Sequence, residues 1–102
     1  MWTLNNSNLF LNADKIHPLK RLQVKSLLDQ LTAQEGVDRV IVFGSSVEDR
    51  CTVLSDVDIC VVSNDKVKRP YAEFPFDLII YKDADNRLLR EINNKGVIVY
   101  EK

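Results

Sequence analysis

The chain has 102 residues, of which 45% are hydrophobic and 28% are charged. This length suits one domain with one hydrophobic core, and the composition excludes an intrinsically disordered chain. The formal net charge of -1 at pH 7 gives no strong case for nucleic-acid binding through bulk charge. We therefore expect a single domain over residues 1–102.

The cysteines and the N-terminus indicate where such a protein works. Cys51 and Cys60 form no CxxC pattern and lie far in sequence from His17, so we expect free thiols and no zinc site. The N-terminus lacks a signal-peptide pattern, and no apolar run approaches the ~20 residues that span a bilayer. These features favour a cytoplasmic protein without membrane contact.

The first third of the chain predicts a polar segment followed by a helix. Residues 1–13 are rich in asparagine, and we expect them to be a loosely ordered N-terminal segment. From Ile16, leucines recur at steps near three and four, which predicts an amphipathic helix to about Gln34. Asp14 is the expected N-cap of this helix, and Pro18 lies in its first turn.

The remainder of the chain predicts a small mixed sheet. Three apolar runs rich in β-branched residues predict strands over residues 39–43, 57–62 and 76–81. A short helix over residues 45–49, a helix that Asp85 caps and a last strand over residues 97–100 complete the pattern. We expect an α/β (α+β) fold whose helices pack mainly on one face of the sheet.

Three aspartates interrupt or adjoin these apolar strands. Asp56 and Asp58 are two residues apart, so both project from one face of a strand, roughly 7 Å apart along the backbone. Asp77 lies on the next strand and reaches the same point if the two strands pair. Carboxylates that share one face repel each other unless a cation lies between them, and Mg²⁺ prefers such oxygen ligands. The alternative is a solvated strand end at Asp56 and an exposed edge residue at Asp77.

The residues after the first strand predict a phosphate site. Gly44 lets the backbone approach a ligand closely, and Ser45 can donate a hydrogen bond from its hydroxyl. With Ser46, these residues start a short helix whose free N–H groups suit an anion. A simple turn with a helix cap is the alternative reading.

These residues together carry a resemblance. Phe43-Gly44-Ser45, ten intervening residues and Asp56-Val57-Asp58 resemble the signature of the DNA polymerase β-like nucleotidyltransferase superfamily, and Asp77 stands where that family places a third carboxylate. The short chain is similar to the minimal nucleotidyltransferases of bacteria and archaea. The resemblance implies the nucleotidyltransferase fold over roughly residues 16–101.

The resemblance also implies roles for these residues. Asp56, Asp58 and Asp77 would hold Mg²⁺, and Asp77 would also act as general base or orient the acceptor hydroxyl. Gly44, Ser45 and Ser46 would bind the phosphates of ATP. This chain departs from the family pattern at one place. Many minimal members have Arg-Ala-Arg-Gly after Gly-Ser, whereas this chain has Ser46-Val47-Glu48-Asp49, so acidic residues replace basic ones. Arg50, Lys66, Lys68 and Arg69 are the candidates to supply the missing charge.

The function implied is a magnesium-dependent transfer of AMP from ATP to a hydroxyl of a protein. Minimal nucleotidyltransferases often accompany a HEPN-domain protein as antitoxin and toxin, so the resemblance implies a HEPN-type partner. One rival is a catalytically weak or inactive protein that acts by binding its partner, which Glu48 and Asp49 favour. Another is a small-molecule transferase of the antibiotic-modifying kind, which usually carries an added helical domain. The exposed apolar segments also permit a homodimer.

Overall fold

The computed structural model describes residues 8–102, so the expectation for the N-terminal segment lies largely outside the described residues. Residues 8–12 form turns. The elements, with 3-10 helices written η, are η1 (Ala13–Lys15), η2 (Pro18–Lys20), α1 (Arg21–Thr32), β1 (Val37–Phe43), η3 (Gly44–Val47), β2 (Val57–Ser63), β3 (Phe76–Ile80), η4 (Tyr81–Asp83), α2 (Asn86–Lys95) and β4 (Val97–Glu101).

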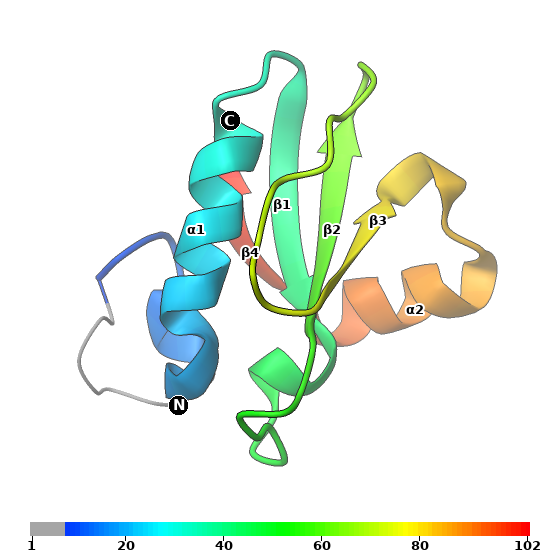
Figure 1. The fold of residues 1–102 in the computed structure, drawn as a ribbon. Coiled ribbons are helices and arrows are strands. Elements are labelled where there is room, and N and C mark those ends of the chain that lie inside the picture. Colours follow the sequence, from blue (N-terminus) through cyan, green and yellow to red (C-terminus); the bar gives the residue numbers. More distant parts are fainter. Residues whose placement is uncertain (1–7) are drawn as a thin grey trace.

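The four strands form one mixed sheet in the order β3-β2-β1-β4 (Figure 1). β1 runs antiparallel to β2 and β4, whereas β2 and β3 are parallel. Residues 64–75 connect the parallel pair, and this length fits the dozen or more residues that such a connection needs. Consequently β2 and β3 both begin at the same edge of the sheet, which is the edge where β1 ends.

The helix α1 covers one face of this sheet. Its buried residues Val24, Leu27, Leu28 and Leu31 pack in one cluster with alternate residues of the strands, including Val40 of β1. The side-chain amide of Gln30 donates to the carbonyl of Tyr71 at 2.8 Å and accepts from its N–H at 2.9 Å. Gln34 binds the backbone of Lys68 in the same way, so the 64–75 connection is held against α1.

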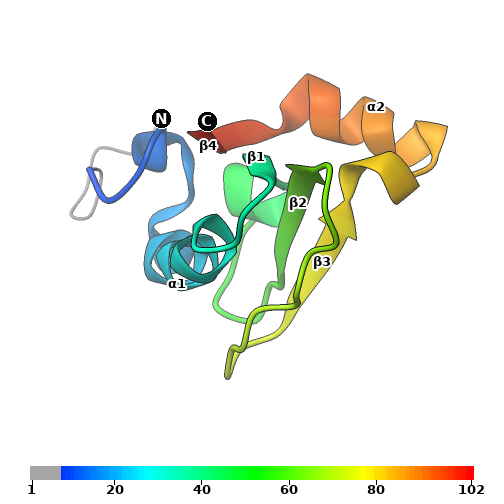
Figure 2. The same cartoon turned by 90° about the horizontal axis from the view of Figure 1, so that it is seen from above.

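The helix α2 covers the opposite face, as the view from above shows (Figure 2). Its residue Ile92 is buried against Ile41, Phe43 and Cys60, which alternate along the strands with the residues that face α1. The mixed sheet is as expected, but the helices are divided between the two faces and are not mainly on one. The reason is that β1 and β2 are apolar on both sides, so each face needs a cover.

The start of α1 also differs in detail from the expectation. Asp14 lies inside η1 and does not cap α1, which begins at Arg21. Instead, His17 caps the preceding turn with Nδ1, which accepts from the N–H of Leu19, and Pro18 takes the first position of η2 as expected. The N–H of His17 donates to the carbonyl of Ser46 at 2.7 Å and so ties this turn to η3.

The described helices can also be compared with the thickness of a membrane. Among residues 8–102, no helix is both long enough and apolar enough to cross a bilayer.

Candidate active site

The predicted carboxylates gather at the edge of the sheet where β2 and β3 begin. Asp58 stands opposite Asp77 in the parallel register of these strands, and opposite Phe43 in the antiparallel register with β1. All three positions share the face of the sheet that carries α2, because their neighbours Cys60 and Ile79 pack there. The parallel pairing of β2 with β3 therefore brings Asp77 beside Asp58, as the sequence suggested if the strands paired.

The Gly44-Ser45 turn lies directly against Asp58. Gly44 has φ +73, a left-handed conformation that side chains rarely adopt. A Cβ added at Gly44 would collide with the carboxylate of Asp58. Glycine is therefore required twice, once for the backbone conformation that turns the chain into η3 and once for the close approach of the carboxylate.

A cleft of about 400 Å³ opens at this edge. Its lining combines residues of the phosphate turn, the loop before β2 and the two strand starts. These residues are Ser45, Arg50, Leu54, Ser55, Asp56, Asp58 and Asp77. Five of the six predicted site residues thus lie at or beside the cleft. The sixth, Ser46, is fully buried beneath the turn, and its hydroxyl has no hydrogen-bond partner among the described residues.

The electrostatics of the cleft centre on Asp58. Its pKa is raised from 3.8 to about 6, chiefly by burial, then by a hydrogen bond with the Asp77 carboxyl and by the negative charge of Asp77. Two carboxyls can share a hydrogen bond only while one of them keeps its proton. Two neighbouring carboxyls therefore line one open cleft, a combination that favours a cation between them.

The donor set fits a hard cation, although the three carboxylates do not form a closed cluster. Within residues 8–102, no group of three His, Cys, Asp or Glu side chains is arranged to hold a metal ion as it stands. Asp58 and Asp77 are adjacent, whereas Asp56 is exposed at the mouth of the cleft. Apart from Arg50, every polar side chain of the lining offers oxygen atoms as possible metal ligands, and Mg²⁺ prefers oxygen ligands.

Sequence spacing left four basic residues as candidates for the positive charge near the phosphates, and the structure distinguishes Arg50 among them. Of the four basic candidates, Arg50 lines the cleft, whereas Arg69 lies with its guanidinium 4.2 Å from the centre of the Phe76 ring. The guanidinium of Arg50 donates to both carboxylate oxygens of Glu48 at 3.1 Å, and this hydrogen bond lowers the pKa of Glu48. One of the acidic residues that depart from the family pattern is therefore paired with the cation beside it.

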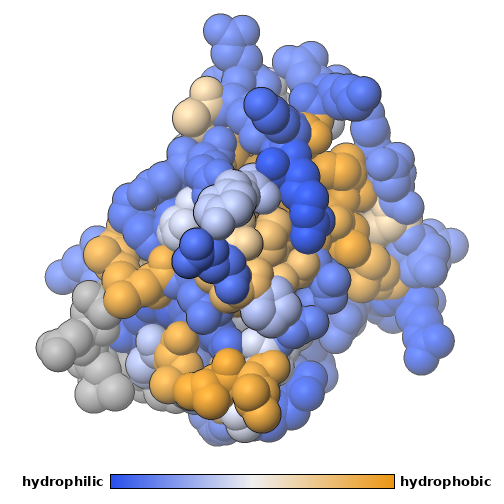
Figure 3. Space-filling model, viewed as in Figure 1, coloured by the Kyte–Doolittle hydropathy of each residue, from blue (hydrophilic) through white to orange (hydrophobic). Residues whose placement is uncertain are grey.

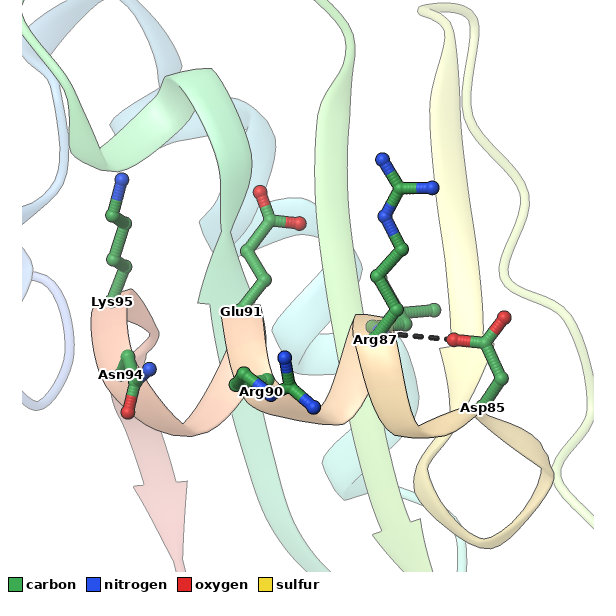
Figure 4. A pocket seen from close by; sticks show the side chains of 7 residues that line it. Asp85, Arg87, Arg90, Glu91, Asn94 and Lys95 are labelled. Atoms are coloured by element: carbon green, nitrogen blue, oxygen red, sulfur yellow. Dashed lines mark hydrogen bonds between the residues drawn. The ribbon is translucent and has the colours of Figure 1, made fainter.

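A second cavity, of about 580 Å³, lies along α2 (Figure 4). Arg87, Glu91 and Lys95 extend from the same side of the helix, and the dashed line marks the N-cap bond from Leu88 N to Asp85 at 2.8 Å. The charge of Glu91 contributes to the raised pKa of Asp58, and the charge of Lys95 to the lowered pKa of Glu48. Charged residues on this side of α2 therefore influence the pKa values of carboxyl groups at and beside the cleft.

Comparisons with known proteins agree with this arrangement. The family model described as "Nucleotidyltransferase domain" matches residues 24–101. A solved structure of a mutant toxin–antitoxin MntA–HpeT is similar with a TM-score of 0.59 and 15% identity, covering 81% of this chain and 73% of that one. A search of curated proteins finds no match. The structural similarity supports the fold, and the family match extends over both the Gly44-Ser45 turn and the carboxylates. The chain belongs to the nucleotidyltransferase domain family.

Proposed function

We propose that this protein transfers AMP from ATP to a hydroxyl of a partner protein, in a reaction that depends on magnesium. The observation that carries the proposal is the convergence of the Gly44-Ser45 turn with Asp58 and Asp77 around one open cleft. Neither feature alone is specific, because turns of Gly-Ser and exposed aspartates are common. Their contact joins a backbone suited to phosphate with carboxylates suited to a divalent cation.

Asp56, Asp58 and Asp77 are the residues that would hold magnesium. When bound, the ion would neutralise charge on the attacking and leaving oxygens of the phosphoryl group. Ser45 lines the cleft next to Asp58, so its hydroxyl is available to bind a phosphate oxygen. Ser46 would contribute only through its backbone, because its side chain is buried.

The acceptor hydroxyl would attack the α-phosphorus, and the bond from that phosphorus to pyrophosphate would break. The new P–O bond forms as the hydroxyl loses its proton. Asp77 is exposed, whereas the neighbouring Asp58 is half-buried, so Asp77 is the more accessible carboxylate of this adjacent pair. We assign Asp77 the task of orienting this hydroxyl and accepting its proton.

A protein acceptor suits the dimensions of the cleft. A nucleotide would fill most of a volume of about 400 Å³, which leaves no enclosed pocket for a second small molecule. An acceptor carried on a partner surface needs no such pocket. The similar solved structure is that of a toxin–antitoxin pair, which supports a protein partner, and a HEPN-type toxin is the partner we propose.

The nucleotide half of the proposal is tested by thermal unfolding. Mg²⁺ with ATP is expected to raise the Tm of the protein, and Asp58→Ala is expected to abolish that rise. Asp83→Asn is the matched control, because it removes an exposed carboxylate on η4 outside the cleft lining. An unchanged response in Asp58→Ala would contradict the proposed nucleotide site.

The transfer half is tested with ATP labelled at the α-phosphate. The purified chain is incubated with the product of the neighbouring reading frame, and labelled protein is separated from labelled nucleotide. We expect label on the partner, lost with Asp56→Asn and with Asp77→Asn. The control is again Asp83→Asn, which should leave the transfer unchanged.

A second candidate function is partner binding without catalysis. The Glu48–Arg50 ion pair favours it, because Arg50 is the cation of the cleft lining and Glu48 competes with a triphosphate for it. If the two proteins co-purify but no label is transferred, and Mg²⁺ with ATP leaves the Tm unchanged, this second function replaces the first.

A further inference from the structure

A hydrogen-bonded turn at the mouth of the cleft displays two aliphatic side chains to solvent. Thr52–Ser55 closes with a bond from the N–H of Ser55 to the carbonyl of Thr52 at 3.0 Å. The N–H of Thr52 also donates to the Ser55 hydroxyl at 3.0 Å. Val53 and Leu54 occupy the two central positions and are 72% and 87% exposed. Gly, Pro, Asn, Asp and Ser usually take such positions, so turn formation does not explain these side chains.

The turn is attached to the start of α1, which adds to the exposed aliphatic surface. Lys20 is buried, and its ammonium donates to the carbonyl of Val53 at 3.3 Å. The residues Leu19 and Leu22, on either side of this anchor, are 47% and 64% exposed. Figure 3 shows hydrophobic surface at the lower end of the view, where the loop before β2 and the start of α1 lie in Figure 1.

We call Leu19, Leu22, Val53 and Leu54 the aliphatic rim, and we propose that it is the docking surface for the protein acceptor. The proposal rests on the proposed function, since it states how the acceptor protein is held. Leu54 belongs both to the rim and to the cleft lining, so a segment on the rim leads directly to the carboxylates. A bound nucleotide could cover Leu54 but not the rest of the rim, because Leu19 and Leu22 lie outside the cleft lining. The nucleotide therefore does not account for the exposed rim.

The charge around the rim indicates the chemistry of this acceptor. Asp49 and Asp56 are exposed in the loop that carries Val53 and Leu54, and Arg50, the cation of this loop, is already paired with Glu48. A docking segment with apolar side chains and flanking Lys or Arg would bury the rim and meet Asp49, and in the metal-free protein also Asp56, with opposite charge. An acidic segment would be repelled.

The same charges argue against a second copy of this chain as the occupant. A two-fold interface centred on the rim would place the same patch on both subunits. It would also bring Asp49 and Asp56 of one copy toward the identical carboxylates of the other. This repulsion is avoided by a different protein that carries basic residues.

Peptide binding tests the docking surface without any catalytic step. Three short fluorescent peptides are compared by anisotropy, each with serine, threonine and tyrosine hydroxyls: one of Leu with Lys, one of Leu with Glu and one of Ser with Lys. We expect the Leu/Lys peptide to bind at least about tenfold more tightly than the other two. The Val53→Ser, Leu54→Ser double variant should lose at least about tenfold of that affinity.

The matched control is Leu11→Ser, which removes an exposed aliphatic side chain outside the rim. It should bind the Leu/Lys peptide as the unaltered protein does. The double variant should keep its Tm, because both altered side chains are exposed, and Val53→Ser alone, outside the cleft lining, should keep the response to Mg²⁺ with ATP. Equal binding of all three peptides, or unchanged binding by the double variant, overturns the docking proposal.

Two further outcomes separate this proposal from the proposed function. Binding with the expected selectivity but without labelling of any peptide supports docking and counts against catalysis. A concentration-dependent dimer in sedimentation, lost in the double variant, would show that a second copy covers the rim and would overturn the proposal.

Discussion

Asp58→Asn is expected to stabilise the metal-free protein at neutral pH while removing its response to Mg²⁺ with ATP. In the native chain the pKa of Asp58 is about 6, against 3.8 for an unperturbed carboxyl, because the group is partly buried and touches Asp77. A difference of that size corresponds to about 3 kcal/mol at neutral pH. Since the side chain is half exposed, solvent screening reduces this to about 1–2 kcal/mol.

The pH dependence follows from the direction of the pKa change. Below pH 3.8 the carboxyl is protonated in both folded and unfolded chains, so ionisation costs nothing. As pH rises from 3.8 to about 6, the unfolded chain ionises more readily, and the folded state loses stability. Above pH 6 both states are ionised and the full penalty remains. The advantage of Asp58→Asn should therefore be absent near pH 4 and complete by pH 7.5.

The measurement is thermal unfolding of both proteins in chelator across this pH range. At pH 7.5 the expected rise in Tm is about 5–10 °C for a domain of this size. The asparagine amide can donate to the Asp77 carboxylate, so the contact is kept while the repulsion is removed. Asp56→Asn is the control, because Asp56 is exposed and should change stability by less than about 0.5 kcal/mol. A lower Tm for Asp58→Asn at pH 7.5, or a difference independent of pH, would refute the reasoning.

Three further predictions concern single residues around the cleft. Gly44→Ala should destabilise the protein by at least about 1 kcal/mol in urea unfolding, because alanine disfavours the positive φ and its Cβ meets Asp58. Glu48→Gln should tighten ATP binding in titration calorimetry by releasing Arg50, and unchanged affinity would show that the pair does not compete with the nucleotide. Cys60 should resist alkylation at pH 8 until the protein unfolds, since burial raises the pKa of its thiol to about 11; mass spectrometry would detect earlier modification.

Strand positions were predictable because their signal is local. The runs over residues 39–43 and 57–62 are apolar except for Arg39 and Asp58, and the structure extends them only to Val37–Phe43 and Val57–Ser63. The placement of α2 was missed, although the same runs contained the clue. A strand with consecutive apolar residues, such as Val40 and Ile41 in β1, has two faces to cover, so helices on both sides should have been expected.

Contacts between distant parts of the chain were not predictable in the same way. The start of α1 depends on His17, whose N–H binds the carbonyl of Ser46. Sequence spacing also left four basic residues as candidates near the phosphates, and only the folded loop brings Arg50 into the cleft. Likewise, the contact of Asp58 with Asp77 follows from the parallel register of β2 and β3, which local patterns do not specify.

One of the features proposed to serve catalysis and docking lowers the stability of the metal-free chain. Of these features, the cost lies at Asp58, whose carboxyl is partly desolvated against Asp77, whereas glycine adopts the positive φ of Gly44 freely and the exposed Leu54 is no more exposed in the unfolded chain. Magnesium would relieve this cost, and an acceptor would add stability separately by covering Val53 and Leu54. If the assignments are correct, stabilisation by Mg²⁺ with ATP should depend on Asp58 and be indifferent to Val53, which lies outside the cleft lining. Stabilisation by the apolar basic peptide should depend on Leu54 and survive Asp58→Asn.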